Sequence, residues 1–298
     1  MDKFKIKFKS EVKKDLNKNR DEKCAPGRDY KEGSCFNIDQ LKLMGNKINN
    51  TEKNSIIKIL DNKREMLKQL NKYFGNRYKC QDQICWIATD IIDELNNTEI
   101  KDLTFRPEGP AKGYEWLSTT DINKVLKQYE SIYPEFQSYG AVPSDFEHIG
   151  MSRSEINDES NRVPMMKNKY KFENLHKLDK HKIGLIVNLD TSGKPGSHWV
   201  ALYVDLKKGD IFFSDSVGYP PNKYIKAYME RIAEHLKKKG MNPNIKINKT
   251  RHQNKDSECG VYSINFILRL LKGEPFEEIS GNKLDDELVN LCRDIYFT

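Results

Sequence analysis

Four polar residues in the second half of the chain have the side chains needed for nucleophilic catalysis by a thiol. A cysteine nucleophile requires a base, a group that orients the base, and donors for the oxyanion that forms on the attacked carbonyl. In chain order the candidates are His198, Asp215, Gln253 and Cys259. The histidine would be the base and the aspartate its orienting group, with the glutamine amide and the cysteine backbone N–H as oxyanion donors. Each residue alone is more often an ordinary polar or buried residue, so the elements that position the set decide its meaning.

Cys259 lies in the stretch NKDSECGVYS, and its thiol is either a small buried hydrophobe or an activated nucleophile. The residues that follow favour the second interpretation, because apolar side chains recur at helical spacing until Gly273 and Pro275 end the pattern. These side chains are Val261, Ile264, Ile267, Leu268 and Leu271. Cys259 is therefore predicted at the start of a buried helix, where unpaired N–H groups and the helix dipole stabilise a thiolate.

Short β-rich runs predict the sheet that would bring the other candidates together. Three of them are KIGLIVNLD (182–190), HWVALYVD (198–205) and DIFFSDS (210–216). His198 begins the second run and Asp215 lies near the end of the third, so a hairpin would set the carboxylate beside the imidazole. A long amphipathic helix (222–240), a further strand (245–249) and the helix from Cys259 complete this half, which predicts an α+β fold.

Trp199, next to the candidate base, is expected to wall a narrow substrate groove, and its alternative interpretation is a core aromatic residue. The remaining histidines lack comparable neighbours in the sequence and are interpreted as structural or solvent-exposed. They are His148, His176, His181, His235 and His252.

The first half of the chain predicts a basic, mainly helical region. The first twenty or so residues suggest a basic strand or arm, and CAPGRDYKEGSC (24–35) suggests a turn-rich loop. Helices are expected over 51–74, closed by Gly75, and over 85–97. A third helix should follow Trp116, with Thr119 or Thr120 as its cap. The polar stretch 138–182 suggests irregular loops.

Composition limits the class of protein. The chain has 298 residues, 37% of them hydrophobic, which suffices for a substantial core. It shows no run of 18 apolar residues and no signal-peptide pattern, so a cytosolic or nuclear protein without a membrane span is expected. The net charge of +7 arises largely from lysines in the first seventy residues. This basic region could bind nucleic acid or an acidic partner, and a solvated helix face is the alternative.

The six cysteines show no C-x-x-C pair and no dense framework, so free thiols are expected. Four of them are the alternative ligands of a zinc ion, although their spacings match no common zinc pattern. These four are Cys24, Cys35, Cys80 and Cys85. The interpretation as a thiol hydrolase requires no metal and no organic cofactor.

The stretches HWVALYVD, FSDS and QNKDSECG resemble the catalytic core of the Ulp1-like cysteine proteases, which include SUMO-deconjugating enzymes and adenovirus-type maturation proteases. The spacings of seventeen from His198 to Asp215 and six from Gln253 to Cys259 match that family, and WLSTTDIN is similar to its upstream Trp-Leu motif. The resemblance covers roughly residues 116–271. CWIATDIIDEL, WLSTTDINKVLKQYE and GAVPSDF are most similar to the capsid-maturation proteases of large cytoplasmic DNA viruses.

This resemblance implies a central mixed sheet flanked by helices, with the nucleophile at a helix N-terminus. It divides the chain into an extra basic, mainly helical accessory region (1–103) and a catalytic domain (104–298). It assigns Cys259 as nucleophile, His198 as general base and acid, Asp215 as orienting group, and Gln253 with the Cys259 N–H as oxyanion hole.

The function that follows is that of a cysteine endopeptidase that forms a thioester and cleaves viral structural polyproteins after small residues, of the Gly-Gly-X type, during virion maturation. Such an enzyme would act in the host cytoplasm and the virion. The alternatives are an isopeptidase acting on SUMO or another ubiquitin-like protein, an effector-type acetyltransferase, and a nucleic-acid-binding scaffold with a decayed protease fold.

Overall fold

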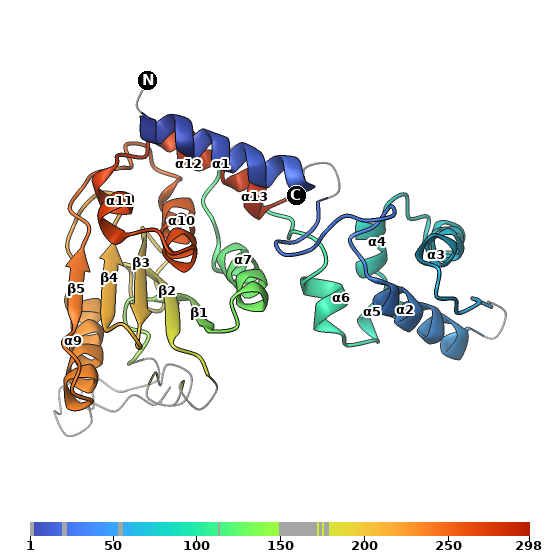
Figure 1. Ribbon diagram of the computed structural model, residues 1–298, viewed down its shortest axis with the longest axis horizontal. Coiled ribbons are helices and arrows are strands. Elements are labelled where there is room, and N and C mark those ends of the chain that lie inside the picture. Colours follow the sequence, from blue (N-terminus) through green and yellow to red (C-terminus); the bar gives the residue numbers. More distant parts are fainter. Residues whose placement is uncertain are drawn as a thin grey trace. The chain divides into compact units, whose positions relative to one another are not determined.

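The computed structural model describes residues 3–19, 23–52, 56–112, 114–148, 172, 175 and 179–298 (Figure 1). The chain forms two compact units. One consists of Met1–Val12 with Gly109–Phe297, and the other of Lys13–Glu108 with Thr298. The assignment of residues 1–103 as an accessory region stays a prediction.

A five-stranded mixed sheet forms the centre of the first unit, and its strands lie side by side in chain order (Figure 1). The strands are β1 (Phe136–Pro143), β2 (Lys182–Asn188), β3 (Trp199–Asp205), β4 (Asp210–Ser214) and β5 (Asn244–Ile247). The outer pairs β1–β2 and β4–β5 are parallel, whereas β2–β3 and β3–β4 are antiparallel. The predicted β-runs over 182–190, 198–205, 210–216 and 245–249 and the α+β class are confirmed.

Most of strand β1 lies in the stretch 138–182, which was predicted to be irregular. Its sequence FQSYGAVP is interrupted by Gly140, which has φ +77°, and the register with β2 shifts between Ser138 and Gly140. A side chain at Gly140 would place its Cβ 2.4 Å from Oδ1 of Asn123, so the strand bends where only glycine fits. The bend hides the alternation that a sequence pattern relies on.

Helices cover both faces of the sheet, and every residue of β3 is buried. The helix α9 (Lys223–Lys238) packs Ile225, Tyr228 and Ile232 into one core with Val200 and Leu202. The other face bears Tyr203 and Phe212, and Phe212 contacts Phe276 of α11 (Phe276–Gly281). On this face lies α10 (Cys259–Leu271), all of whose residues are buried. The predicted helices over 222–240 and from Cys259 are confirmed.

The helix α7 (Thr119–Ile132) packs against β1, and its N-cap lies one residue before the first predicted cap. Ser118 is its N-cap, and Asp121 completes a capping box by accepting the Ser118 backbone N–H. The prediction of Thr119 or Thr120 as cap is therefore wrong, because both threonines already lie inside the helix.

The N-terminal stretch forms a helix, α1 (Lys3–Asn19), so the prediction of a strand or arm is wrong. The alternating lysines and hydrophobes imitate a strand, but the buried residues Phe8 and Val12 are four apart and share one helical face. Within the first unit, Lys5 pairs with Asp285 at 2.7 Å and the Arg269 guanidinium lies 5.3 Å from the Phe4 ring centroid.

The unit Lys13–Glu108 is built from short helices. They are α2 (Ile38–Thr51), α3 (Lys63–Tyr78), α4 (Gln83–Ile87), α5 (Asp90–Asp93) and α6 (Thr98–Asp102). The predicted helix over 51–74 is confirmed only from Lys63, because residues 56–62 are not helical and Asn62 caps α3. Its predicted end at Gly75 is wrong, since α3 continues to Tyr78. The predicted helix over 85–97 is divided at Thr89, whose hydroxyl donates to the Trp86 carbonyl.

Two disulfide bonds join Cys24 to Cys35 and Cys80 to Cys85, so the expectation of free thiols is wrong for these four residues. The bonds close loops around a core in which the Trp86 ring stacks between those of Phe36 and Phe74. The spacing of the cysteines in the sequence did not indicate these two pairs, because spacing alone does not show which cysteines come together in the folded unit. The free cysteines among the described residues are Cys259 and Cys292. No helix in the described part of the chain has the length and apolar character to cross a bilayer.

Candidate active site

His198 and Asp215 meet because neighbouring antiparallel strands place them at the same edge of the sheet. His198 directly precedes β3, and Asp215 directly follows β4, whose Ser214 is opposite Ala201. The His198 Nε2 lies 2.8 Å from Oδ1 of Asp215. The aspartate is 1% exposed, and the same oxygen accepts the Val217 N–H. The backbone N–H of Val217 therefore helps to fix the orientation of the carboxylate that contacts the imidazole.

Cys259 occupies the first position of α10 and is 1% exposed. The Cys259 thiol lies next to His198, and since the imidazole Nε2 faces Asp215, Nδ1 is the ring nitrogen left for the sulfur. Burial, the largest influence, disfavours the charged imidazole, but the hydrogen bonds and charges of Asp215 and Cys259 outweigh it and raise the pKa of His198 to about 9. An imidazolium at this place stabilises a thiolate, which is the nucleophilic form of cysteine.

Gln253 lies buried in the loop before α10 and reaches the same site indirectly. Its Oε1 accepts the Ser216 hydroxyl at 2.6 Å, and its Nε2 donates to the Lys255 carbonyl at 2.7 Å. The Ser216 carbonyl also accepts the Gln253 backbone N–H. An amide nitrogen carries two hydrogens, so one Nε2 hydrogen remains beyond the bond to Lys255. The structure thus joins His198, Asp215 and Cys259 directly and places Gln253 beside the residue that follows the aspartate.

Trp199 is buried, and its indole Nε1 donates to the Leu117 carbonyl at 3.0 Å. Leu117 also lies against the first turn of α10, where a Cβ added to Gly260 would meet the Leu117 Cβ at 3.0 Å. The neighbouring Trp116 is 49% exposed. The hydrogen bond to Leu117 thus fixes the position of the Trp199 indole. Its role as a wall of the substrate groove stays a prediction.

Several buried polar residues near the nucleophile were not identified from the sequence. Ser216, Glu258, Asp286, Asn290 and Arg293 are all buried. The available signal was the occurrence of polar side chains at positions 286, 290 and 293 among the apolar residues of LDDELVNLCRDIYF. This spacing places them on one face of a helical segment.

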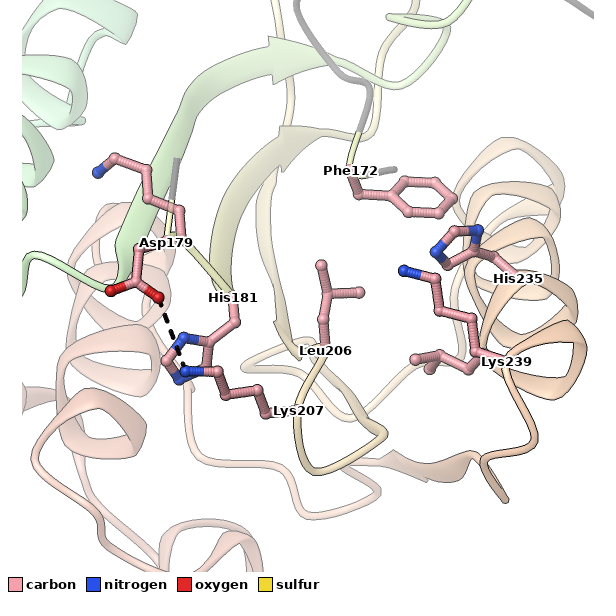
Figure 2. A pocket seen from close by; sticks show the side chains of 9 residues that line it. Phe172, Asp179, His181, Leu206, Lys207, His235 and Lys239 are labelled. Carbon is pink, nitrogen blue, oxygen red and sulfur yellow. Dashed lines mark ion pairs between the residues drawn. The ribbon is translucent and has the colours of Figure 1, made fainter. Parts of the chain in front are cut away.

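A separate cavity of about 210 Å³ (Figure 2) is present in the first unit, at the opposite end of β3 from His198. Leu206, which follows the last residue of β3, lines it together with His181 and Lys239, whereas His198 precedes the first residue of that strand. Seven strand residues separate the two ends, or roughly 20 Å at the usual rise per residue. The cavity is therefore not part of the site around Cys259.

Within the described ranges, no group of three or more His, Cys, Asp or Glu side chains is arranged to hold a metal ion. The four cysteines considered as zinc ligands form the two disulfides instead. Of the histidines predicted to be structural, His252 is buried and its Nδ1 accepts the Leu284 N–H at 3.2 Å. Burial, together with the neighbouring charges of Arg269 and Lys283, lowers the pKa of His252 to about 4.

A cysteine at a helix start, next to a histidine that is hydrogen-bonded to an aspartate, is the arrangement typical of a cysteine peptidase. Residues 146–296 match the family described as the Ulp1 protease family, C-terminal catalytic domain. The chain belongs to this family and is a cysteine protease.

Relatives from two large viruses support the family and extend beyond the catalytic domain. A protein of Acanthamoeba polyphaga mimivirus that has been assigned as a thiol protease is 39% identical over 293 residues, which cover 92% of each chain. The cysteine protease of an African swine fever virus isolate is 27% identical and covers 70% of this chain and 79% of the relative. In another isolate the corresponding protein is named a SUMO-1 cysteine protease. The crystal structure of the African swine fever virus protease superimposes with a TM-score of 0.61 at 19% identity, covering 93% of this chain and 96% of that one, and so confirms the fold.

Proposed function

We propose that this protease is an endopeptidase that cleaves structural polyproteins after small residues during virion maturation, through a thioester on Cys259. The observation that carries the proposal is the hydrogen bond between His198 and Asp215, with the Cys259 thiol next to the same imidazole at the start of α10. In this proposal Asp215 orients the imidazole, and Gln253 with the Cys259 backbone N–H forms the oxyanion hole. The viral relatives, one of which matches 92% of the chain, are the reason for placing this activity in a virus.

The reaction begins when the Cys259 thiolate attacks the carbonyl carbon of the scissile peptide. A C–S bond forms, and the carbonyl electron pair moves to oxygen, where the oxyanion donors receive it. The oxyanion collapses, the C–N bond breaks, and the His198 imidazolium gives its proton to the leaving amine. This leaves a thioester and a neutral imidazole.

Hydrolysis of the thioester restores the enzyme. His198 takes a proton from a water molecule as that water attacks the thioester carbonyl, and a second oxyanion forms in the same hole. Its collapse breaks the C–S bond and releases the carboxylic acid product, which ionises. Cys259 leaves as a thiolate beside the reprotonated histidine.

Two kinds of substrate test the proposed specificity. One is a short linear peptide that contains Gly-Gly-X, and the other is a folded ubiquitin-like protein with a C-terminal leaving group. We expect efficient cleavage of the short peptide, and loss of cleavage when the two glycines are replaced by leucines. Strict dependence on the folded protein would favour the isopeptidase alternative. The name of the second African swine fever virus relative, a SUMO-1 cysteine protease, is in line with that alternative. Equal cleavage after large side chains would contradict the preference for small residues.

The basic N-terminal region is proposed as a docking site for nucleic acid or an acidic partner. Its lysines serve more than one purpose, because Lys5 pairs with Asp285 while Lys9 and Lys13 of α1 are exposed. Binding of the full chain to a DNA duplex, measured between 50 and 200 mM salt (roughly the range over which phosphate contacts weaken), should fall steeply. Replacing Lys9 and Lys13 by glutamine should reduce the slope, whereas an unchanged slope would leave them as solvated surface.

A further inference from the structure

The loop between the two proposed oxyanion donors is attached at both ends to a distant segment of the chain. This loop runs from Gln253 to Cys259, and the segment includes α12 (Asp286–Asn290) and the start of α13 (Arg293–Tyr296). Oxyanion donors stabilise a developing charge only if their positions are fixed beforehand, and a misplacement of about 1 Å can cost about 10²-fold in rate. The contacts that hold this loop therefore bear on catalysis.

The first attachment is Asp286, a buried carboxylate directly after the N-cap of α12. Its Oδ2 accepts the backbone N–H groups of Asn254 at 3.0 Å and of Lys255 at 3.1 Å. Its Oδ1 accepts the hydroxyl of Tyr262, 3.1 Å away on α10. The carbonyl of Lys255 in turn accepts the Gln253 side-chain amide. Asp286 thus holds the backbone N–H of Lys255, the residue whose carbonyl accepts the Gln253 amide, and connects it to the helix that carries Cys259.

The second attachment is a buried polar network beside the nucleophile. The Arg293 guanidinium donates to the Ser257 carbonyl at 3.1 Å, to the Pro110 carbonyl at 2.9 Å and to Oδ1 of Asn290 at 2.7 Å. Asn290 donates to the Glu258 carboxylate at 3.0 Å. Buried side chains therefore hold the chain directly before Cys259 at two points, the Ser257 carbonyl and the Glu258 carboxylate.

The spacing of these residues explains how one short segment serves both ends of the loop. Asp286, Asn290 and Arg293 are separated by four and three residues, so their side chains point to the same side of the segment. Each of them has hydrogen-bond partners that belong to the loop or bridge to it. Burying a charge costs desolvation free energy, so buried charges need a reason to be retained. Here that reason is the fixed geometry of the loop backbone.

We propose that Asp286 and Arg293 are positioning residues that fix the two oxyanion donors, Asp286 acting through the Gln253 amide and Arg293 through the backbone N–H of Cys259. This inference rests on the proposed function of the site. It gives the C-terminal segment a role in the rate of the chemical step. Neither residue contacts the substrate in this proposal.

The test compares Asp286→Asn with Glu287→Gln, a matched change at an exposed neighbour on the same helix. The asparagine keeps the size of the side chain but puts an amide in place of an oxygen that accepts N–H groups. We expect kcat on a Gly-Gly-X peptide to fall by about 10- to 10²-fold with a smaller change in KM. In a Gln253→Ala background the same substitution should cost less than about 3-fold, because the donor through which it acts is gone.

Two further readouts separate positioning from general damage. Alkylation of Cys259 by iodoacetamide forms no oxyanion and should keep its rate within about 2-fold in Asp286→Asn. The affinity for a peptide aldehyde, whose adduct carries an oxyanion, should weaken together with kcat. Arg293→Lys keeps the charge but loses the forked contacts, and it provides a second variant with the same expected pattern in these two readouts if Asp286→Asn fails to fold.

The proposal is overturned if kcat of Asp286→Asn equals that of Glu287→Gln, if its full effect persists without the Gln253 amide, or if alkylation slows as much as turnover. Wild-type and Cys259→Ala proteins are measured alongside. Turnover that survives in Cys259→Ala would overturn the proposed function and this inference with it. Turnover that depends on Cys259 but is untouched by Asp286→Asn would overturn the inference alone.

Discussion

In the catalytic unit every residue of β3 is buried and helices cover both faces of the sheet, whereas the unit Lys13–Glu108 consists of short helices with two disulfides. The first arrangement fixes atoms that are far apart in sequence, because strand register decides that His198 meets Asp215. The second depends on helix caps such as Asn37 and on covalent loop closure. The two units should therefore respond differently to substitution: small changes in the first should alter the chemistry, and larger changes in the second should alter mainly stability.

The largest effect is expected from Asp215→Asn. The amide can accept from the imidazole in the wrong tautomer or donate to it, so the histidine is no longer oriented as a base, and kcat should fall by about 10³- to 10⁴-fold. Asp210→Asn, at the other end of β4, is the matched control and should stay active. Retained activity in Asp215→Asn would show that the hydrogen bond seen at 2.8 Å is not needed for turnover.

Removal of one oxyanion donor should have the next largest effect. Gln253→Ala is expected to lower kcat by about 10²- to 10³-fold with less effect on KM, because the interaction is made mainly in the transition state. Gln137→Ala, an amide removed from β1, serves as the control. An unchanged kcat in the Gln253 variant would place that side chain outside the oxyanion hole.

The alkaline limb of the activity profile reports the charge state of His198. Its pKa of about 9 in the folded protein lies above the ordinary 6.5, so the associated stability is fully present below about pH 6.5 and is lost as pH rises through about 9. Turnover should fall about 10-fold per pH unit above about pH 9, when the imidazolium that protonates the leaving amine is lost. In Asp215→Asn the midpoint should move to lower pH. A wild-type midpoint near 6.5 would contradict the geometry of the bonded histidine.

The disulfides should have the smallest effect on turnover. Replacing Cys24 and Cys35 by serine should lower the free energy of unfolding of their unit by about 2–3 kcal/mol, as expected for a loop of this length, and should change kcat by less than about 2-fold. Addition of a reductant should lower the stability of the wild-type chain by at least this amount and that of the variant by less, because the variant retains only the Cys80–Cys85 bond. A wild-type stability that is insensitive to the reductant would show that these thiols are not paired.

The sequence predicted the elements whose signals are local and missed those that depend on tertiary contacts. The runs around His198 and Asp215 alternate or cluster β-branched and aromatic residues, and the helix from Cys259 has a strong apolar period, so each was identifiable. Strand β1 was missed because Gly140 bends it around Asn123. The helix α1 was misinterpreted because lysines alternate with hydrophobes over residues that pack only on one helical face.

The site itself divides in the same way. His198, Asp215, Gln253 and Cys259 lie at element ends that a sequence pattern locates, and the structure joins three of them directly. The residues that hold the loop, such as Asp286 and Arg293, act through backbone groups about thirty positions away. A local sequence pattern does not indicate which distant carbonyl or N–H group a buried side chain will hydrogen-bond.

The central claim is that Cys259, activated by His198, forms the covalent intermediate. The most direct measurement is to mix the protein with a Gly-Gly thioester or ester substrate, quench with acid within the first turnover, and locate the acyl group by mass spectrometry of the digested chain. The account predicts an acyl group on the peptide that contains Cys259, little acylation in His198→Ala, and none in Cys259→Ala. An acyl group on Cys292, which is also free and buried, or turnover that persists in Cys259→Ala, would contradict it.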